Sequence, residues 1–93
     1  MIVAYLRSAK GAESQLSAQK LAIEKAYGPV DRIYKDDGAG VKMRPGLQDA
    51  IESLAVGDVL AVERVDRLSR SIELCREVIA DVQERGASVI SVE

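Results

Sequence analysis

Short apolar runs alternate along this chain with longer segments in which apolar residues recur every three or four positions. The runs at residues 2–6, 58–62 and 87–92 are almost continuously apolar, and a weaker run lies at 32–35. Continuous apolar runs of this length are typical of strands whose two faces are both covered. The pattern therefore predicts four strands of a largely parallel sheet.

The first longer segment predicts a helix over residues 14–27. Leu16 and Ile23 lie seven positions apart on one face of it, and Gly28 and Pro29 end it. The polar residues just before this helix contain Gly11 and predict a loop.

Two further helices are predicted from clearer apolar stripes. One begins at Pro45 and stops before Gly57, and its stripe is formed by Leu47, Ala50, Ile51 and Leu54. The other spans residues 70–85 and stops at Gly86, and its stripe is formed by Ile72, Cys75, Ile79 and Val82. Residues 36–43 carry two glycines and no periodicity, so a loop is predicted there.

The alternation of strands and helices predicts an α/β fold, a three-layer sandwich in which helices flank a mostly parallel four-stranded sheet. Ligands bind to such sheets beyond the carboxyl ends of the strands. The residues that follow the first three predicted strands are Arg7, Ser8, Asp36, Asp37, Asp66 and Arg67. This edge is therefore where we expect the functional site.

Length and charge limit what the chain can be. Its 93 residues suffice for one domain, and its net charge of −2 is unlike that of a free-standing nucleic-acid-binding domain. It has no histidine and one cysteine, which excludes an intramolecular disulfide and makes a zinc site improbable. We expect Cys75 to be a buried packing residue, and we expect a cytoplasmic protein because no signal peptide or membrane segment is evident.

An arginine-rich segment follows the third predicted strand. Arg64, Arg67 and Arg70 lie within residues 63–71, and the last two would share one helix face if a helix begins near them. The planar guanidinium group matches the geometry of phosphate oxygens. For binding a phosphate, a local cluster of arginines matters more than the net charge of the whole chain. The segment therefore predicts a phosphate-binding site.

Several short motifs, in a fixed order, resemble those of one enzyme family. They are Tyr5-Leu6-Arg7, Gln19, Asp36 with Gly38 and Gly40, Arg44-Pro45-Gly46-Leu47, Gly57-Asp58 and Asp66-Arg67-Leu68-Ser69-Arg70. With these motifs, nearly the whole chain resembles the catalytic domain of serine recombinases of the resolvase/invertase family. The resemblance implies a site-specific recombinase whose serine attacks a DNA phosphodiester, forms a 5′-phosphoserine link and then religates the strand to a new partner.

The resemblance also assigns roles to residues. Arg7, Arg44, Arg67 and Arg70 would form a cationic cradle for the phosphate, Asp66 would orient an arginine or carry a proton, and Gln19 and Asp36 would hold the arginines in place. Arg64 and Lys42 would contact the DNA backbone. No metal and no cofactor are implied. Simpler roles compete: Asp66 could be a helix N-cap, Asp36 a turn cap, and Arg44 a solvated loop residue.

The nucleophile departs from the family pattern. The family motif Tyr-x-Arg-Val-Ser aligns its serine with Ala9, and Ser8 lies one position early. Successive strand residues point to opposite faces, so Ser8 can serve as the nucleophile only if a local bulge redirects it, and we predict such a bulge. The alternative is a degenerate domain that binds DNA or partners without cutting. A phosphoacceptor signalling domain would instead place paired acids where Arg7 and Ser8 stand.

The resemblance finally sets expectations for the whole protein. Members of this family continue into a dimerisation helix and a separate DNA-binding domain, so we expect residues 1–93 to be the catalytic domain of a longer protein of bacterial, phage or mobile-element origin. DNA is the expected partner, and the complete protein should form dimers that pair into tetramers. The domain alone should bind DNA weakly and without sequence preference.

Overall fold

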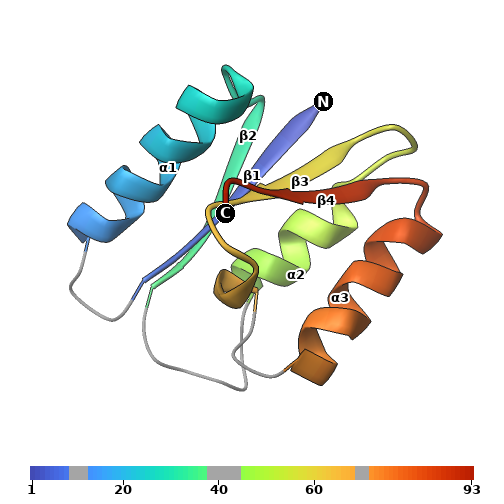
Figure 1. The fold of residues 1–93 in the computed structure, drawn as a ribbon. Coiled ribbons are helices and arrows are strands. Elements are labelled where there is room, and N and C mark those ends of the chain that lie inside the picture. The colour runs from blue at the N-terminus through green and yellow to red at the C-terminus, as the bar shows by residue number, and fades with distance from the viewer. Residues whose placement is uncertain (9–12, 38–44, 69–71) are drawn as a thin grey trace.

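The computed structural model describes residues 1–8, 13–37, 45–68 and 72–93 and shows one open sheet flanked by helices (Figure 1). In chain order the elements are β1 (Ile2–Ser8), α1 (Glu13–Tyr27), β2 (Arg32–Asp37), α2 (Pro45–Glu52), β3 (Val59–Val62), the 3-10 helix η1 (Val65–Arg67), α3 (Ile72–Glu84) and β4 (Ser88–Ser91). The strands pair in parallel in the order β2-β1-β3-β4. The predicted α/β sandwich with a parallel four-stranded sheet is confirmed.

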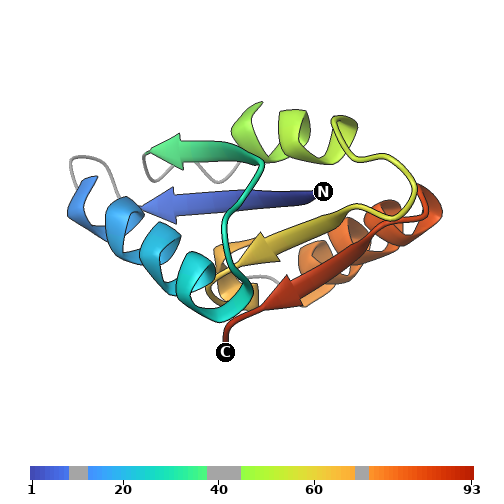
Figure 2. The same ribbon diagram turned by 90° about the horizontal axis from the view of Figure 1, so that it is seen from above.

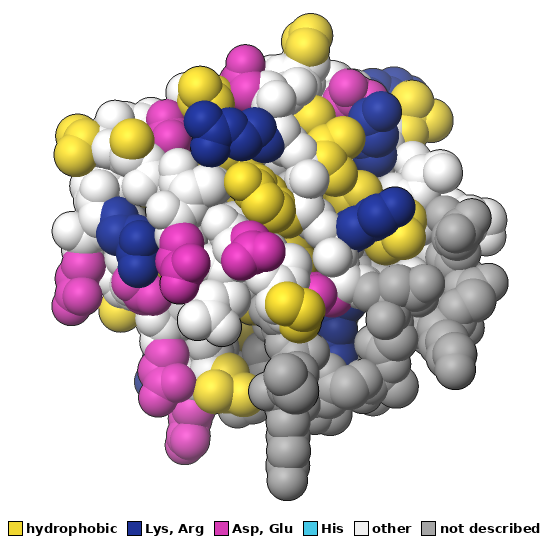
Figure 3. Space-filling model, turned by 180° about the vertical axis from the view of Figure 1, so that it is seen from behind, with side chains coloured by type: hydrophobic (Ala, Val, Ile, Leu, Met, Phe, Trp, Pro, Cys, Tyr) yellow, Lys and Arg dark blue, Asp and Glu magenta, His cyan; other side chains and the backbone are white. Residues whose placement is uncertain are grey.

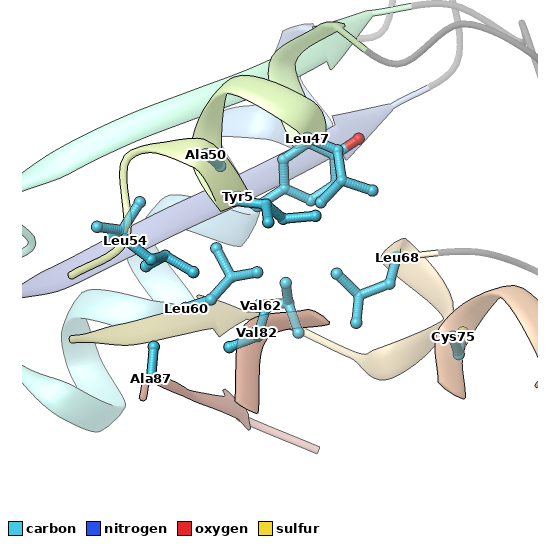
Figure 4. Close-up of a cluster of buried hydrophobic side chains, with 12 residues drawn as sticks. Tyr5, Leu47, Ala50, Leu54, Leu60, Val62, Leu68, Cys75, Val82 and Ala87 are labelled. Atoms are coloured by element: carbon cyan, nitrogen blue, oxygen red, sulfur yellow. The ribbon is translucent and has the colours of Figure 1, made fainter. Parts of the chain in front are cut away.

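The helices lie on both faces of the sheet and divide the core in two (Figure 2). Alternate residues of β1 point to opposite faces. Ala4 and Leu6 pack toward α1, in a cluster with Leu16 and Ile23. The opposite face packs against α2 and α3, where Tyr5 lies in the larger cluster drawn in Figure 4.

Both strands that precede the candidate site are longer than predicted. β1 and β2 stay paired from Val3↔Arg32 to Ser8↔Asp37, so the polar residues at their ends belong to the strands and not to loops. The backbone ladder, which the apolar pattern does not record, carries these positions into the sheet. Arg7 is therefore fixed by strand pairing.

The predicted helices differ from the observed ones at their ends. α2 ends at Glu52, and the following turn places the Oγ of Ser53 2.7 Å from the carbonyl of Ala50, while Leu54 stays buried. α3 begins at Ile72, whose side chain is 71% exposed, so its predicted place in the buried stripe was wrong. Leu68, the residue just after η1, is fully buried in the core cluster that Ile72 was predicted to join.

Two smaller predictions also have outcomes. Cys75 is buried, as expected, and its thiol lies 3.6 Å from the carbonyl oxygen of Val65. In the part of the chain that the structure describes, no helix combines the length and the apolar character needed to cross a lipid bilayer.

Candidate functional site

The end of β1 is held by a buried glutamine from α1. β1 pairs with β3 only as far as Ala4↔Ala61, so Arg7 lies beyond the end of that pairing. The side-chain amide of Gln19 takes the place of a strand there: its Oε1 accepts a hydrogen bond from the N–H of Arg7 at 3.0 Å, and its Nε2 donates to the carbonyl of Arg7 at 2.7 Å. Gln19 is fully buried. Its amide thus satisfies two backbone groups of the strand that carries Arg7.

We expect Gln19→Ala to lower the free energy of unfolding by about 2–3 kcal/mol, because it removes the hydrogen bonds that Gln19 makes with two backbone groups of Arg7 and opens a small cavity. Chemical denaturation of the variant and of Gln15→Ala measures this. Gln15 is exposed on the same helix and should cost less than about 0.5 kcal/mol. Equal losses in the two variants would refute this role for Gln19.

Asp36 joins three elements at the carboxyl edge of the sheet. It lies in β2, and its carboxylate accepts hydrogen bonds from the Tyr5 hydroxyl at 2.7 Å, from the N–H of Gly46 at 2.8 Å and from the N–H of Leu47 at 3.0 Å. The last two are free donors of the first turn of α2, so Asp36 caps this helix across space and places a negative charge at its positive end. Asp36 therefore caps helix α2, and the competing interpretation of Asp36 as a turn cap is wrong.

The start of α2 lies very close to β2. A Cβ atom on Gly46 would come within 2.3 Å of the carbonyl oxygen of Lys35, so glycine is needed for this approach. Pro45 begins the helix, where its missing N–H and fixed φ are favourable. The contacts of Asp36 thus fix the first turn of α2 beside the ends of β1 and β2.

Arg67 is held by a carboxylate that the sequence analysis did not single out. Nη2 of Arg67 lies 3.2 Å and Nε 3.4 Å from Oε1 of Glu63, at the end of β3. Nε of Arg64 lies 3.9 Å from the same oxygen. The four-residue spacing of Glu63 and Arg67 is the signal that could have revealed the pair.

The setting of Arg67 also differs from the prediction. Arg67 is the last residue of η1 and precedes α3 by several positions, so it is not in the first turn of a long helix. Arg70 lies outside the described residues, so the helix face that it would share with Arg67 stays a prediction. Arg64, the residue before η1, has an extended backbone and a side chain that is 44% exposed.

Ser8 lies inside β1, where it is paired with Asp37 and is 3% exposed. The register of β1 and β2 is continuous through Ser8, so the bulge predicted at Ser8 is wrong. Strand alternation places Arg7 on the face of Tyr5, and Ser8 on the opposite face together with Leu6. Arg7 and Ser8 are therefore turned away from each other.

The turn that leads into β3 is closed by Asp58. Its carboxylate accepts a hydrogen bond of 2.9 Å from the N–H of Ala55, and this bond is the main cause that lowers the pKa of Asp58 below its ordinary value. The charges of the amino terminus and of Arg32 add to this lowering of the pKa. The Gly57-Asp58 motif thus has a structural role at the amino end of β3, opposite the candidate site.

Comparison with known proteins decides the family. Residues 2–93 match the protein-family model described as the N-terminal domain of resolvase. The chain belongs to the resolvase family of serine recombinases. It is 37% identical to the Tn552 transposon resolvase of Staphylococcus aureus over 94 residues, and 40% identical to a probable DNA-invertase, y4cG, of Sinorhizobium fredii over 75 residues. These matches cover 100% and 80% of this chain but only 46% and 24% of the two relatives.

Solved structures agree with the fold of this resolvase-family domain. The N-terminal catalytic domain of TP901-1 integrase superposes with a TM-score of 0.71 at 28% identity, covering 98% of this chain and 75% of that one. The catalytic domain of ISC1926 TnpA, an IS607-like serine recombinase, gives a TM-score of 0.80 at 21% identity, covering 99% and 67%. Other relatives of the domain come from phages, such as the DNA-invertase of Escherichia phage P1.

Some predicted site residues of this resolvase-family domain are not part of the description. The backbone of Asp66 lies in η1, but its side chain is outside the described part of the chain. The others that lie outside the described residues are Ala9, Gly38, Gly40, Lys42, Arg44, Ser69 and Arg70. Their assigned roles stay predictions. The described part brings Arg7, Gln19, Asp36 and Arg67 to the carboxyl ends of β1, β2 and β3, as predicted.

Proposed function

We propose that this chain is the catalytic part of a site-specific DNA recombinase that cuts and rejoins phosphodiesters through a serine. The observation that carries the proposal is that a carboxylate orients Arg67 at the end of β3, while Arg7 is fixed one residue before the end of the neighbouring strand β1. Both belong to a chain that matches the resolvase family over residues 2–93. Guanidinium groups at the carboxyl edge of a parallel sheet suit a phosphate ligand.

On the face drawn in Figure 3, the described Lys and Arg side chains stand apart from one another and form no broad basic patch, and acidic side chains lie on the same face. Together with the net charge of −2, this argues that electrostatic attraction to DNA depends on the few arginines of the site. We propose Arg7, Arg44, Arg67 and Arg70 as these arginines, with Asp66 orienting one of them or carrying a proton.

In the proposed reaction the serine Oγ attacks the phosphorus and loses its proton, while the bond from the phosphorus to the 3′ oxygen of the DNA breaks and that oxygen takes up a proton to leave as a 3′ hydroxyl. The product holds the 5′ phosphate on the serine, and a 3′ hydroxyl of a second strand then reverses the reaction. Each step exchanges one phosphate ester for another, so no energy source is needed. Stabilising the charge on the pentacoordinate phosphate is the task of the arginines. Ser8 is the proposed nucleophile, and its burial requires that the end of β1 rearrange before attack.

The test is direct detection of the phosphoserine link. The protein is incubated with a pool of duplex oligonucleotides of random sequence, denatured, digested with nuclease and protease, and analysed by mass spectrometry. We expect a nucleotide on the peptide that contains Ser8, and none with Ser8→Ala. Ser17→Ala, which removes an exposed serine of α1, is the control and should leave the adduct unchanged. An adduct that persists in Ser8→Ala would overturn the assignment of the nucleophile.

A second function is favoured by one specific observation. Ser8 is buried on the face opposite Arg7, and Ala9 occupies the position of the family nucleophile. A domain of this kind would bind DNA or other recombinase subunits without cutting. DNA binding without any serine-linked adduct would establish this second function.

The partners of the complete protein follow from the same proposal. DNA is the proposed substrate, and we propose self-association into dimers that pair into tetramers, with residues 1–93 as the catalytic domain. Two relatives that match most of this chain are named as a resolvase and a DNA-invertase. We also propose that the complete protein acts in the cytoplasm of a bacterium.

A further inference from the structure

We infer that Glu63 acts as an internal substitute for the DNA phosphate and that DNA must displace it to engage Arg67. This inference rests on the proposed function, because it concerns how the same site takes its substrate. It adds a positioning residue, Glu63, to the arginines already proposed.

The contact occupies the edge of Arg67 that suits phosphate. Nε and Nη2 form one two-pronged edge of the guanidinium group, and both lie within 3.4 Å of the same carboxylate oxygen of Glu63. Phosphate oxygens use this kind of edge. A phosphodiester and Glu63 therefore compete for the same two donors.

Both partners are held by the backbone around them. The carbonyl of Glu63 accepts a hydrogen bond of 3.0 Å from the N–H of Glu93, and the N–H of Arg67 donates to the carbonyl of Arg64 at 3.0 Å. The side chains of Glu63 and Arg67 are only 21% and 24% exposed. The pair therefore persists without DNA, and displacement proceeds by side-chain rotation and not by movement of the chain.

The pair has two consequences for binding. The carboxylate cancels the attraction of Arg67 for a distant phosphate, and it repels a phosphate that arrives close by. An isolated anion gains little binding free energy by replacing Glu63 at Arg67. A phosphodiester that other arginines of the site also hold gains enough binding free energy to displace Glu63. Glu63 thus weakens non-specific DNA contacts, and it keeps Arg67 oriented for a phosphate that the other arginines have already bound in the site.

The experiment compares Glu63→Gln with the unchanged protein and with a matched control. Asp81→Asn is the control, because Asp81 on α3 forms another pair with a residue four positions later, Arg85, which directly follows α3. The Nε of Arg85 lies 3.1 Å from the Oδ1 of Asp81. Each variant loses one negative charge and one such pair. Affinity for a short duplex of random sequence is measured by fluorescence anisotropy over a range of salt concentrations, and the Nε–H resonance of Arg67 is followed by NMR without DNA.

We expect Glu63→Gln to bind the duplex about three- to tenfold more tightly and to increase the salt slope by up to about 0.9, as for one added phosphate contact. Asp81→Asn should change affinity less than twofold. The gain should vanish in the background of Arg67→Ala. The Nε–H resonance of Arg67 should shift in Glu63→Gln and not in Asp81→Asn. A purely structural role of Glu63 away from Arg67 would not produce this shift.

The outcomes separate the inference from the proposed function. Unchanged or weaker binding by Glu63→Gln, in a protein that binds DNA, overturns the inference and leaves the proposed function standing. A gain that survives in the Arg67→Ala background also overturns it. If the resonance of Arg67 moves as expected but neither protein binds DNA at low salt, the proposed function fails, and the inference fails with it.

Discussion

Arg67→Ala is expected to abolish covalent capture of DNA while leaving the fold intact. Arg67 lies at the carboxyl end of β3, and Nε and Nη2 on one edge of its guanidinium group are held 3.4 Å and 3.2 Å from Glu63. These two donors can stabilise the charge on the reacting phosphate once the phosphate has displaced Glu63. Loss of one preorganised donor to such a charge typically lowers the rate about 10²–10³-fold. The measurement is the yield of serine-linked adduct against time, with circular dichroism to confirm folding.

The matched control for this prediction is Arg85→Ala. Arg85 also pairs with a carboxylate four residues earlier and is 37% exposed, but it lies at the end of α3 and away from the strand ends proposed as the site. Its loss should change the adduct yield less than twofold. Full adduct formation by Arg67→Ala would remove Arg67 from the proposed cradle.

The same variant remains informative if the domain binds DNA without cutting it. In that case Arg67→Ala should weaken binding and lower the salt slope by up to about 0.9, since one phosphate contact is lost. Arg85→Ala should leave the slope unchanged. A loss of affinity without a change in slope would point to an indirect effect of Arg67 on the fold.

The apolar pattern was enough to predict the sheet but not the ends of its strands. The cores of β1 and β3 are buried on two faces and read as continuous apolar runs, whereas β4 is an edge strand that is only partly buried. The prediction placed Arg7 and Ser8 directly after the first strand, yet backbone pairing with β2 and the amide of Gln19 extend the strand through them. Hydrogen bonds between distant backbone segments leave no periodic mark in the sequence.

The sequence was enough to predict which residues belong to the candidate site, but not which contacts they make. Motif spacing located Asp36 and Arg67, but it did not predict that Asp36 caps a helix ten residues later or that Arg67 ends a short 3-10 turn. The partner of Arg67, Glu63, was visible as a charge pair four residues apart. It was missed because the resemblance directed attention to cations.

Asp36→Ala is expected to lower the free energy of unfolding by about 2–4 kcal/mol, the largest stability effect among the described site residues. The substitution removes the cap of α2 and leaves the hydroxyl of fully buried Tyr5 without its carboxylate partner. Chemical denaturation measures the loss. Asp49→Ala, which removes an exposed carboxylate from α2 itself, should change stability by less than about 0.5 kcal/mol.

A double-mutant cycle with Tyr5→Phe separates the two contributions. Tyr5→Phe alone should cost about 1 kcal/mol, because it breaks the 2.7 Å hydrogen bond to Asp36. In the Asp36→Ala background the same change should be neutral or stabilising, since the hydroxyl that it removes has already lost its hydrogen bond to Asp36. Equal costs of Tyr5→Phe in both backgrounds would show that the hydroxyl does not depend on Asp36. The loss in Asp36→Ala would then belong to the cap of α2, the helix that begins directly after Arg44.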